Sequence, residues 1–178
     1  KKKTIVFWKT RINFTDDELK VLNLLSNKYP HSSEGRDGNI LKDLPFAVKK
    51  VNDILDVYLP RKYKKYLVNS WNMQYLKGEK IPHKPHNHAY AHLGFVFYTK
   101  SDGNSRLLLL EENGLEFKIE VRPNDFIVIP PQLVHTAEAG IATSDRILFS
   151  GDIILTTMEY ESSDFLSPTK QWIELDNE

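Results

Sequence analysis

The stretch "DFIVIPPQLVHTAEAGIATSDRILFSGDIILT", Asp125 to Thr156, decides the fold class of this chain. Its first and last runs are short, apolar and rich in β-branched residues, a composition typical of buried strands. A Pro-Pro pair ends the first run, and the polar segment "EAGIATSD" separates it from the second. The stretch therefore predicts β structure, with a single histidine, His135, just after the Pro-Pro turn.

The period of a strand continues back to Tyr66. The other segments with this composition lie at 66–76, 91–100, 105–112 and 115–121. Asn113-Gly114 lies between two of them and predicts a hairpin with a type I′ turn. At least six strands in about 90 residues predict a mainly β fold of the sandwich or barrel type, with helices packed outside.

Two helices are expected before these strands. The segment "TDDELKVLNLLSNKY" begins with Thr15 and Glu18 in capping-box spacing, and its leucines share one face. A second helix is expected from Pro45 to Tyr58, because proline is tolerated in a first turn and the apolar residues form a buried stripe. Pro60 ends this helix.

The length of 178 residues predicts a single domain. We divide it into helical N-terminal support over 1–65, a β core over 66–156 and a C-terminal tail over 157–178. The tail is weakly patterned, although "KQWIEL" is suited to an edge strand.

The composition limits the kinds of partner and chemistry that we expect for this protein. Lysine plus arginine and aspartate plus glutamate both total 24, so no charge excess favours nucleic acid. The absence of cysteine excludes disulfides, thiolate catalysis and cysteine-type zinc sites. No apolar run approaches the ~18 residues of a membrane span, and no secretory signal begins the sequence. We expect a cytoplasmic protein with no membrane partner.

The segment "KIPHKPHNHAYAH" holds four of the six histidines: His83, His86, His88 and His92. In an extended segment His86 and His88 point to the same face, which His92 shares and His83 does not. Two imidazoles on one face bind a divalent metal when a distant residue supplies a third ligand. His135 is the only histidine downstream. A lone histidine is usually a surface or core residue, but this clustering favours a metal site.

Three segments together resemble the 2-oxoglutarate/Fe(II)-dependent oxygenases. "SWNMQYLKGEKIP" is similar to the entry of their prolyl-hydroxylase-like members, with Tyr75 and Gly78 as the Y-x-x-G pair. "HNHAYAHLGFVFY" resembles an H-x-H motif followed by a glycine/aromatic strand, and "VRPNDFIVIPPQLVHTAEAGIATSDRILFSGDIIL" resembles the distal-histidine region. The likeness covers about Leu67 to Leu155 and is strongest to a branch from marine bacteria and their phages.

This resemblance implies a fold and a set of roles. The fold is the double-stranded β-helix, the jelly roll that cupins share. His86, His88 and His135 correspond to catalytic metal ligands for Fe(II). Arg146 corresponds to the anchor of the distal carboxylate of the cosubstrate 2-oxoglutarate, with Tyr75 beside it. We expect Arg146 to begin the antiparallel neighbour of the strand that His135 starts.

The sequence departs from the usual motifs of this superfamily at three positions. His88 occupies the place of the usual aspartate or glutamate, Leu148 stands where a small hydroxyl residue is common, and Asp152 stands where this branch usually has asparagine.

The expected function is that of a dioxygenase, a hydroxylase of a small molecule or a peptide. The same residues also fit a cupin, with His92 in the place of the usual glutamate. The alternatives are therefore a cupin-type dioxygenase or isomerase that uses no 2-oxoglutarate, and a non-enzymatic metal-binding barrel.

Overall fold

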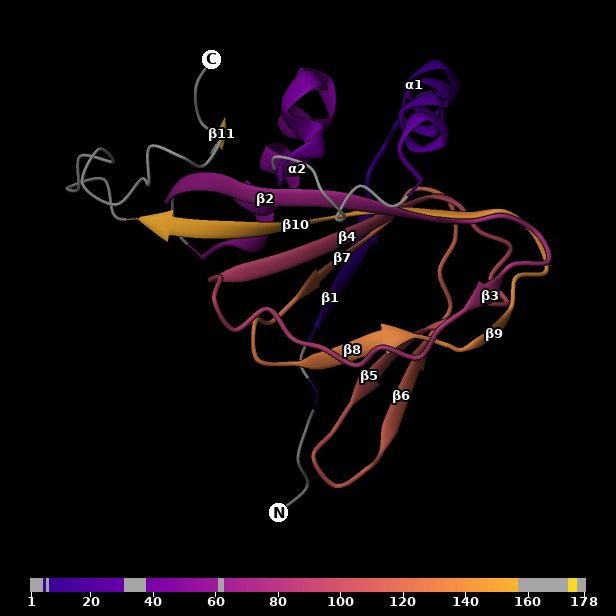
Figure 1. The fold of residues 1–178 in the computed structure, drawn as a ribbon. Coiled ribbons are helices and arrows are strands. Elements are labelled where there is room, and N and C mark those ends of the chain that lie inside the picture. The colour runs from indigo at the N-terminus through magenta and orange to yellow at the C-terminus, as the bar shows by residue number, and fades with distance from the viewer. Residues whose placement is uncertain (1–4, 6, 31–37, 61–62, 157–172, 176–178) are drawn as a thin grey trace.

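The protein is described by a computed structural model over residues 5, 7–30, 38–60, 63–156 and 173–175. Two sheets face each other, and the helices cover the outer face of the larger one (Figure 1). The larger sheet has the strand order β1-β7-β4-β10-β2-β11, the smaller sheet has the order β6-β5-β8, and β3 pairs with β9. This arrangement is the expected double-stranded β-helix.

The elements follow one another along the chain with these bounds: β1 Trp8–Arg11, α1 Asp16–Lys28, the 3₁₀ helix η1 Ile40–Asp43, α2 Pro45–Tyr58, β2 Lys64–Tyr75, β3 Lys80–Ile81, β4 Leu93–Lys100, β5 Leu107–Leu110, β6 Glu116–Ile119, β7 Asp125–Ile129, β8 Val134–Ala137, β9 Gly140–Ile141, β10 Arg146–Thr156 and β11 Ile173–Glu174. Neither α-helix is long and apolar enough to span a membrane, within the part of the chain that the structure describes.

Both helices form where the sequence predicts them. Thr15 caps α1 through a complete capping box, in which its hydroxyl accepts from the Glu18 backbone and the Glu18 carboxylate accepts from the Thr15 N–H. Helix α2 has the predicted bounds, with Pro45 in its first turn.

Successive side chains of β4 point to opposite faces of the sheet and pack into two separate hydrophobic cores. Phe95 and Phe97 point to the helices and pack with residues such as Leu22 and Leu55. Val96 and Tyr98 point between the two sheets, where strands β5 and β7 complete the packing. Each buried ring or aliphatic side chain contributes about 1.5–3 kcal/mol from the loss of apolar surface to water. The helices therefore stiffen one face of the large sheet, and the opposite face is available for a site.

Strand β10 lies at the centre of the large sheet, between β2 and β4. Arg146 lies opposite Tyr75 of β2, and six residues later Asp152 lies opposite Asn69 of β2 and Gly94 of β4. This one strand thus carries side chains to two separated levels of the space between the sheets.

Several details differ from the sequence-based expectations. Strand β1 joins the large sheet beside β7, although we assigned this region only to helical support. The 111–115 hairpin forms, but Asn113 does not share the positive φ of Gly114, so the turn is not type I′. The Gly114 N–H instead closes a turn on the Glu111 carbonyl, with glycine in the left-handed conformation. Strand β11 pairs with the edge of β2, which agrees with the strand expected in "KQWIEL".

Candidate metal centre and cosubstrate pocket

His86 and His135 meet because the loop before β4 pairs with β8. The N–H of each residue donates to the carbonyl of the other, at 3.1 and 2.9 Å, in an isolated antiparallel bridge. Their ring centroids are 4.5 Å apart. Residues that face each other in this way place their side chains on the same side of the pair.

His88 reaches the same point from two residues further along the loop. Its N–H donates to the Pro131 carbonyl, which lies in the turn before β8. The ring lies 5.2 Å from His86 and 4.9 Å from His135, centroid to centroid. One nitrogen from each of the three rings lies within 4.8 Å of the others, so the three side chains converge.

A hydrogen-bond partner lies at the Nδ1 atom of every one of these rings. Nδ1 of His86 faces the Lys84 carbonyl at 2.8 Å, and Nδ1 of His135 faces the Leu133 carbonyl at 3.0 Å. Nδ1 of His88 faces the Asp152 carboxylate. An imidazole that donates from Nδ1 keeps the lone pair of Nε2, which is the form that binds a metal.

Burial favours the neutral form of the His135 ring, which is the form that binds a metal. Loss of solvent contact, which penalises the charged ring, lowers the pKa of His135 to about 4. The Nε2 atom of His88 is buried and has no hydrogen-bond partner among the described residues. A buried nitrogen of this kind is costly unless something binds it.

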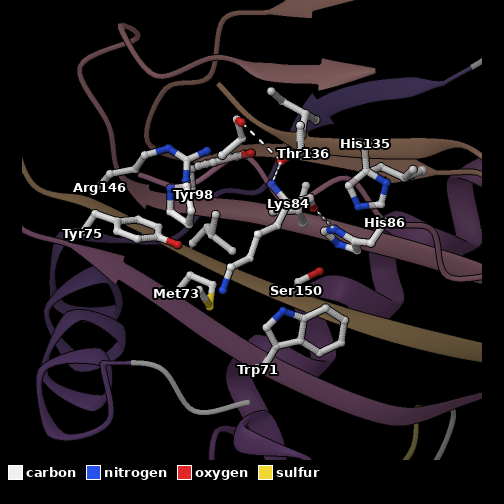
Figure 2. Close-up of a pocket in the computed structure, with 16 residues that line it drawn as sticks. Trp71, Met73, Tyr75, Lys84, His86, Tyr98, His135, Thr136, Arg146 and Ser150 are labelled. Atoms are coloured by element: carbon white, nitrogen blue, oxygen red, sulfur yellow. Dashed lines mark hydrogen bonds between the residues drawn. The ribbon is translucent and has the colours of Figure 1, made fainter. Parts of the chain in front are cut away.

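A cavity of about 190 Å³ extends from the histidines into the space between the sheets. Figure 2 shows His86 and His135 at one end of this pocket and Arg146 with Tyr75 at the other. The lining is mostly apolar and includes Met73, Val96, Leu107, Ile129 and Leu148. No acidic side chain lines it among the described residues.

Arg146 is buried, with 3% of its surface exposed. None of its three guanidinium nitrogens has a hydrogen-bond partner among the described residues. Its Cζ lies 5.3 Å from the ring centroid of Tyr98, a cation–π contact that orients the group but leaves its in-plane donors available. Because a buried cation without a counter-charge is unfavourable, an anion at this end of the pocket would stabilise the guanidinium.

Tyr75 and Lys84 extend toward the same space. Burial raises the pKa of Tyr75, an effect that the nearby Arg146 charge partly offsets, so its phenol remains protonated and able to donate. Lys84, held by a bond from its backbone N–H to the Thr136 hydroxyl, sends its side chain across the middle of the pocket (Figure 2). Arg146, Tyr75 and Lys84 therefore face the cavity with hydrogen-bond donors that suit an anionic group.

The remaining histidines of the cluster lie outside this group. His83 is exposed, and His92 accepts at Nδ1 from the Leu155 N–H while its own N–H donates to the Ile153 carbonyl. His92 therefore fixes the loop against β10 and does not belong to the group in which His86, His88 and His135 converge. The loop turns and bends over residues 89–92, whereas our prediction for His92 assumed an extended segment.

Our prediction that Arg146 begins the antiparallel neighbour of the His135 strand was wrong. His135 lies in β8 of the small sheet, whereas Arg146 begins β10 of the large sheet and pairs with β2 and β4. The two residues face each other across the cavity because the chain crosses between sheets after β8. The contact between Asp152 and His88, 64 positions apart, was also not predicted; the signals were the place of Asp152 in an apolar strand and its departure from the usual asparagine.

Comparison with known structures identifies proteins of similar fold. Neither a protein-family model nor a curated protein matches the sequence. The structure is similar to the non-heme α-ketoglutarate-dependent epimerase SnoN from nogalamycin biosynthesis, with a TM-score of 0.64 and 11% identity over 84% of this chain and 78% of that one. A second structure of that epimerase contains Fe³⁺, α-ketoglutarate and nogalamycin RO.

Two further neighbours have the same fold. An oxidoreductase of the 2OG-Fe(II) oxygenase family from Burkholderia pseudomallei matches with a TM-score of 0.59 and 12% identity, over 84% of this chain and 83% of that one. A prolyl-4-hydroxylase from Pseudomonas putida matches with a TM-score of 0.55 and 14% identity, over 84% and 87%. The chain thus has the double-stranded β-helix fold of the 2-oxoglutarate/Fe(II)-dependent oxygenases.

Proposed function

We propose that this protein is an Fe(II)- and 2-oxoglutarate-dependent oxygenase that hydroxylates a small molecule or a peptide. One observation carries the proposal: a single pocket has at one end His86 and His135, which converge with His88, and at the other a buried guanidinium without a hydrogen-bond partner among the described residues. A molecule that chelates a metal with one end and presents a carboxylate at the other matches both ends. The fold and its neighbours support the same activity.

The three histidines fit the metal. Their Nδ1 atoms are held by two carbonyls and one carboxylate, which leaves the Nε2 lone pairs for Fe(II). In the bound state we expect each coordinating nitrogen at about 2.0–2.2 Å from the ion, the distance usual for imidazole ligands. Three protein ligands leave positions open for other molecules, as a catalytic site requires.

Arg146 fits the distal carboxylate of the cosubstrate. A guanidinium offers two parallel N–H donors to a carboxylate, and burial strengthens this pairing because water does not compete. Tyr75 lies opposite Arg146 in the β2–β10 register and donates its phenol to the same group. Mostly apolar side chains, with Lys84 among them, line the pocket around the chain of the cosubstrate between its two polar ends.

When bound together, Fe(II) and 2-oxoglutarate supply oxidising chemistry in which O₂ and the 2-oxo acid yield succinate, CO₂ and a hydroxylated product. The part of the protein is to hold both in fixed positions. The histidine rings are locked through their Nδ1 bonds, and Arg146 fixes the depth of the cosubstrate. Such preorganised charges and donors contribute without further rearrangement during the reaction.

The test begins with an anaerobic Fe(II) titration, followed by addition of 2-oxoglutarate and O₂. We expect succinate to form at a rate that depends on Fe(II) and 2-oxoglutarate. His135→Ala should abolish it, and His83→Ala, which changes an exposed histidine of the same segment, should not. Iron binding with no consumption of 2-oxoglutarate would contradict the proposal.

The all-histidine ligand set favours a second candidate, a cupin-type metalloenzyme that uses no 2-oxo acid. In that reading His92 would complete the site. Its Nδ1 instead accepts from the Leu155 backbone and it lies outside the converging group, which supports the oxygenase. The same assay separates the two, because the cupin would bind metal and leave 2-oxoglutarate unchanged.

A further inference from the structure

Asp152 is buried completely beside the histidine cluster. Its Oδ1 lies 2.5 Å from Nδ1 of His88, and its Oδ2 accepts from the Tyr90 hydroxyl at 2.7 Å. The Asn69 amide lies at a longer 3.4 Å from the same Oδ2. Both carboxylate oxygens are therefore committed to fixed partners.

His88 differs from the other two histidines in this respect. Backbone carbonyls hold His86 and His135, whereas a carboxylate holds His88. No lysine or arginine pairs with Asp152 among the described residues, and its close contact is with Nδ1 of the His88 ring. A buried carboxylate in this position lacks a compensating positive charge until something cationic lies nearby.

Two aromatic rings also pack against the His88 ring. Trp71 stacks on it at 5.4 Å and Tyr90 at 6.1 Å between centroids, with interplanar angles of 27° and 15°. Gly94, opposite Asp152 on β4, lies close to the same ring, since an added Cβ would be in van der Waals contact with Nδ1 of His88 at 3.4 Å. This packing holds the His88–Asp152 pair in one geometry.

We propose that Asp152 is a positioning residue that supplies, through the His88 ring, the negative charge that an all-histidine ligand set lacks. The usual Fe(II) site of two histidines and one carboxylate carries its anion on the metal. Here the same charge lies behind one imidazole, where it holds the ring as the Nδ1-protonated tautomer and makes Nε2 a stronger donor. This inference rests on the proposed function, since it assumes that His88 binds a divalent metal.

Asp152→Asn tests the charge with little change of shape. The amide oxygen still accepts from Nδ1 of His88, and the amide N–H donates to the Tyr90 oxygen. We expect Ni²⁺ affinity, measured by calorimetry without cosubstrate, to fall by roughly 10–100-fold. Asp53→Asn, which removes a charge from an exposed position of α2, should bind Ni²⁺ as the unchanged protein does. Tyr90→Phe keeps the charge and should have a smaller effect than Asp152→Asn.

A measurement on the unchanged protein covers the case in which Asp152→Asn fails to fold. Nitrogen-15 NMR of the histidine rings, with and without Zn²⁺, should show His88 protonated at Nδ1 in both states and shifted at Nε2 when metal is added. A proton on Nε2, or metal at Nδ1, would overturn the proposal. Equal Ni²⁺ affinity of folded Asp152→Asn and the unchanged protein would overturn it too. Failure of the unchanged protein to bind any of these metals would instead remove the proposed function, and this inference with it.

Discussion

The two ends of the pocket are built differently. At the histidine end each ring already has a protein partner at Nδ1, so the side chains are oriented before any ligand arrives. At the Arg146 end the guanidinium nitrogens are buried without hydrogen-bond partners among the described residues. The difference indicates that the protein orients the histidine rings by itself, whereas it leaves the guanidinium at the other end without a partner of its own.

Removal of one of the three histidine side chains should have the largest effect on metal affinity. We expect His135→Ala to reduce Ni²⁺ affinity by more than the roughly 10–100-fold that follows loss of a group behind a ligand. Calorimetry with Ni²⁺ measures it, and His83→Ala is the matched control because that histidine is exposed. Equal losses in the two variants would show that His135 is not a ligand.

Arg146→Ala should separate the two ends. The variant removes the partner of a buried carboxylate, so 2-oxoglutarate should bind Ni²⁺-loaded protein more weakly by about 2–5 kcal/mol. Ni²⁺ affinity should be nearly unchanged, because we propose that the residue binds the cosubstrate and not the metal. Arg106→Ala, which removes a partly exposed arginine paired with Glu138, should alter neither. If Arg146→Ala weakened metal and left 2-oxoglutarate binding intact, the assignment of the two ends would be wrong.

A substitution at Gly151 tests the packing of β10, the strand that carries both Arg146 and Asp152. It lies between Arg146 and Asp152 along β10, and an added Cβ would approach the Phe95 ring to 2.5 Å and Leu67 to 2.8 Å. Gly151→Ala should therefore lower stability by about 1–3 kcal/mol through overpacking. Thermal or denaturant unfolding gives the value. Gly94→Ala, whose Cβ would meet its nearest atom at 3.4 Å, should cost less, and the opposite order would contradict this packing.

Thr15→Ala should affect the scaffold and leave the pocket unchanged. Loss of the capping box on α1 should cost about 0.5–2 kcal/mol in unfolding free energy. Helix α1 lies on the outer face of the large sheet, so Ni²⁺ and 2-oxoglutarate affinities should stay the same (Figure 1). A change in either affinity, measured well below the unfolding temperature, would show that the outer layer is coupled to the site.

Elements with strong local signals were predictable from the sequence. Helix α2 begins and ends where its proline and its apolar stripe indicate, and the capping box places the start of α1. The short strands β1, β3, β8 and β9 have from two to four residues each, too few to show a period. Their pairing partners come from distant parts of the chain, so only the folded structure reveals them.

The candidate site divides in the same way. The H-x-H spacing and the position of His135 predict a group of three histidines, and the structure brings those side chains together. The contact between His88 and Asp152 depends on the register of β10 with β4, which no local pattern encodes. The separation of β8 and β10 into different sheets was missed for a related reason, since "EAGIATSD" reads as a simple turn but contains β9.

The most direct test of a pocket with two complementary ends is the affinity of 2-oxoglutarate with and without metal. Calorimetric titration of the unchanged protein under matched conditions gives both values. If one molecule contacts the histidine-bound metal and Arg146 together, Ni²⁺ should tighten 2-oxoglutarate binding by about tenfold or more, and 2-oxoglutarate should tighten Ni²⁺ binding by the same factor. Equal affinity in the presence and absence of Ni²⁺ would contradict the account.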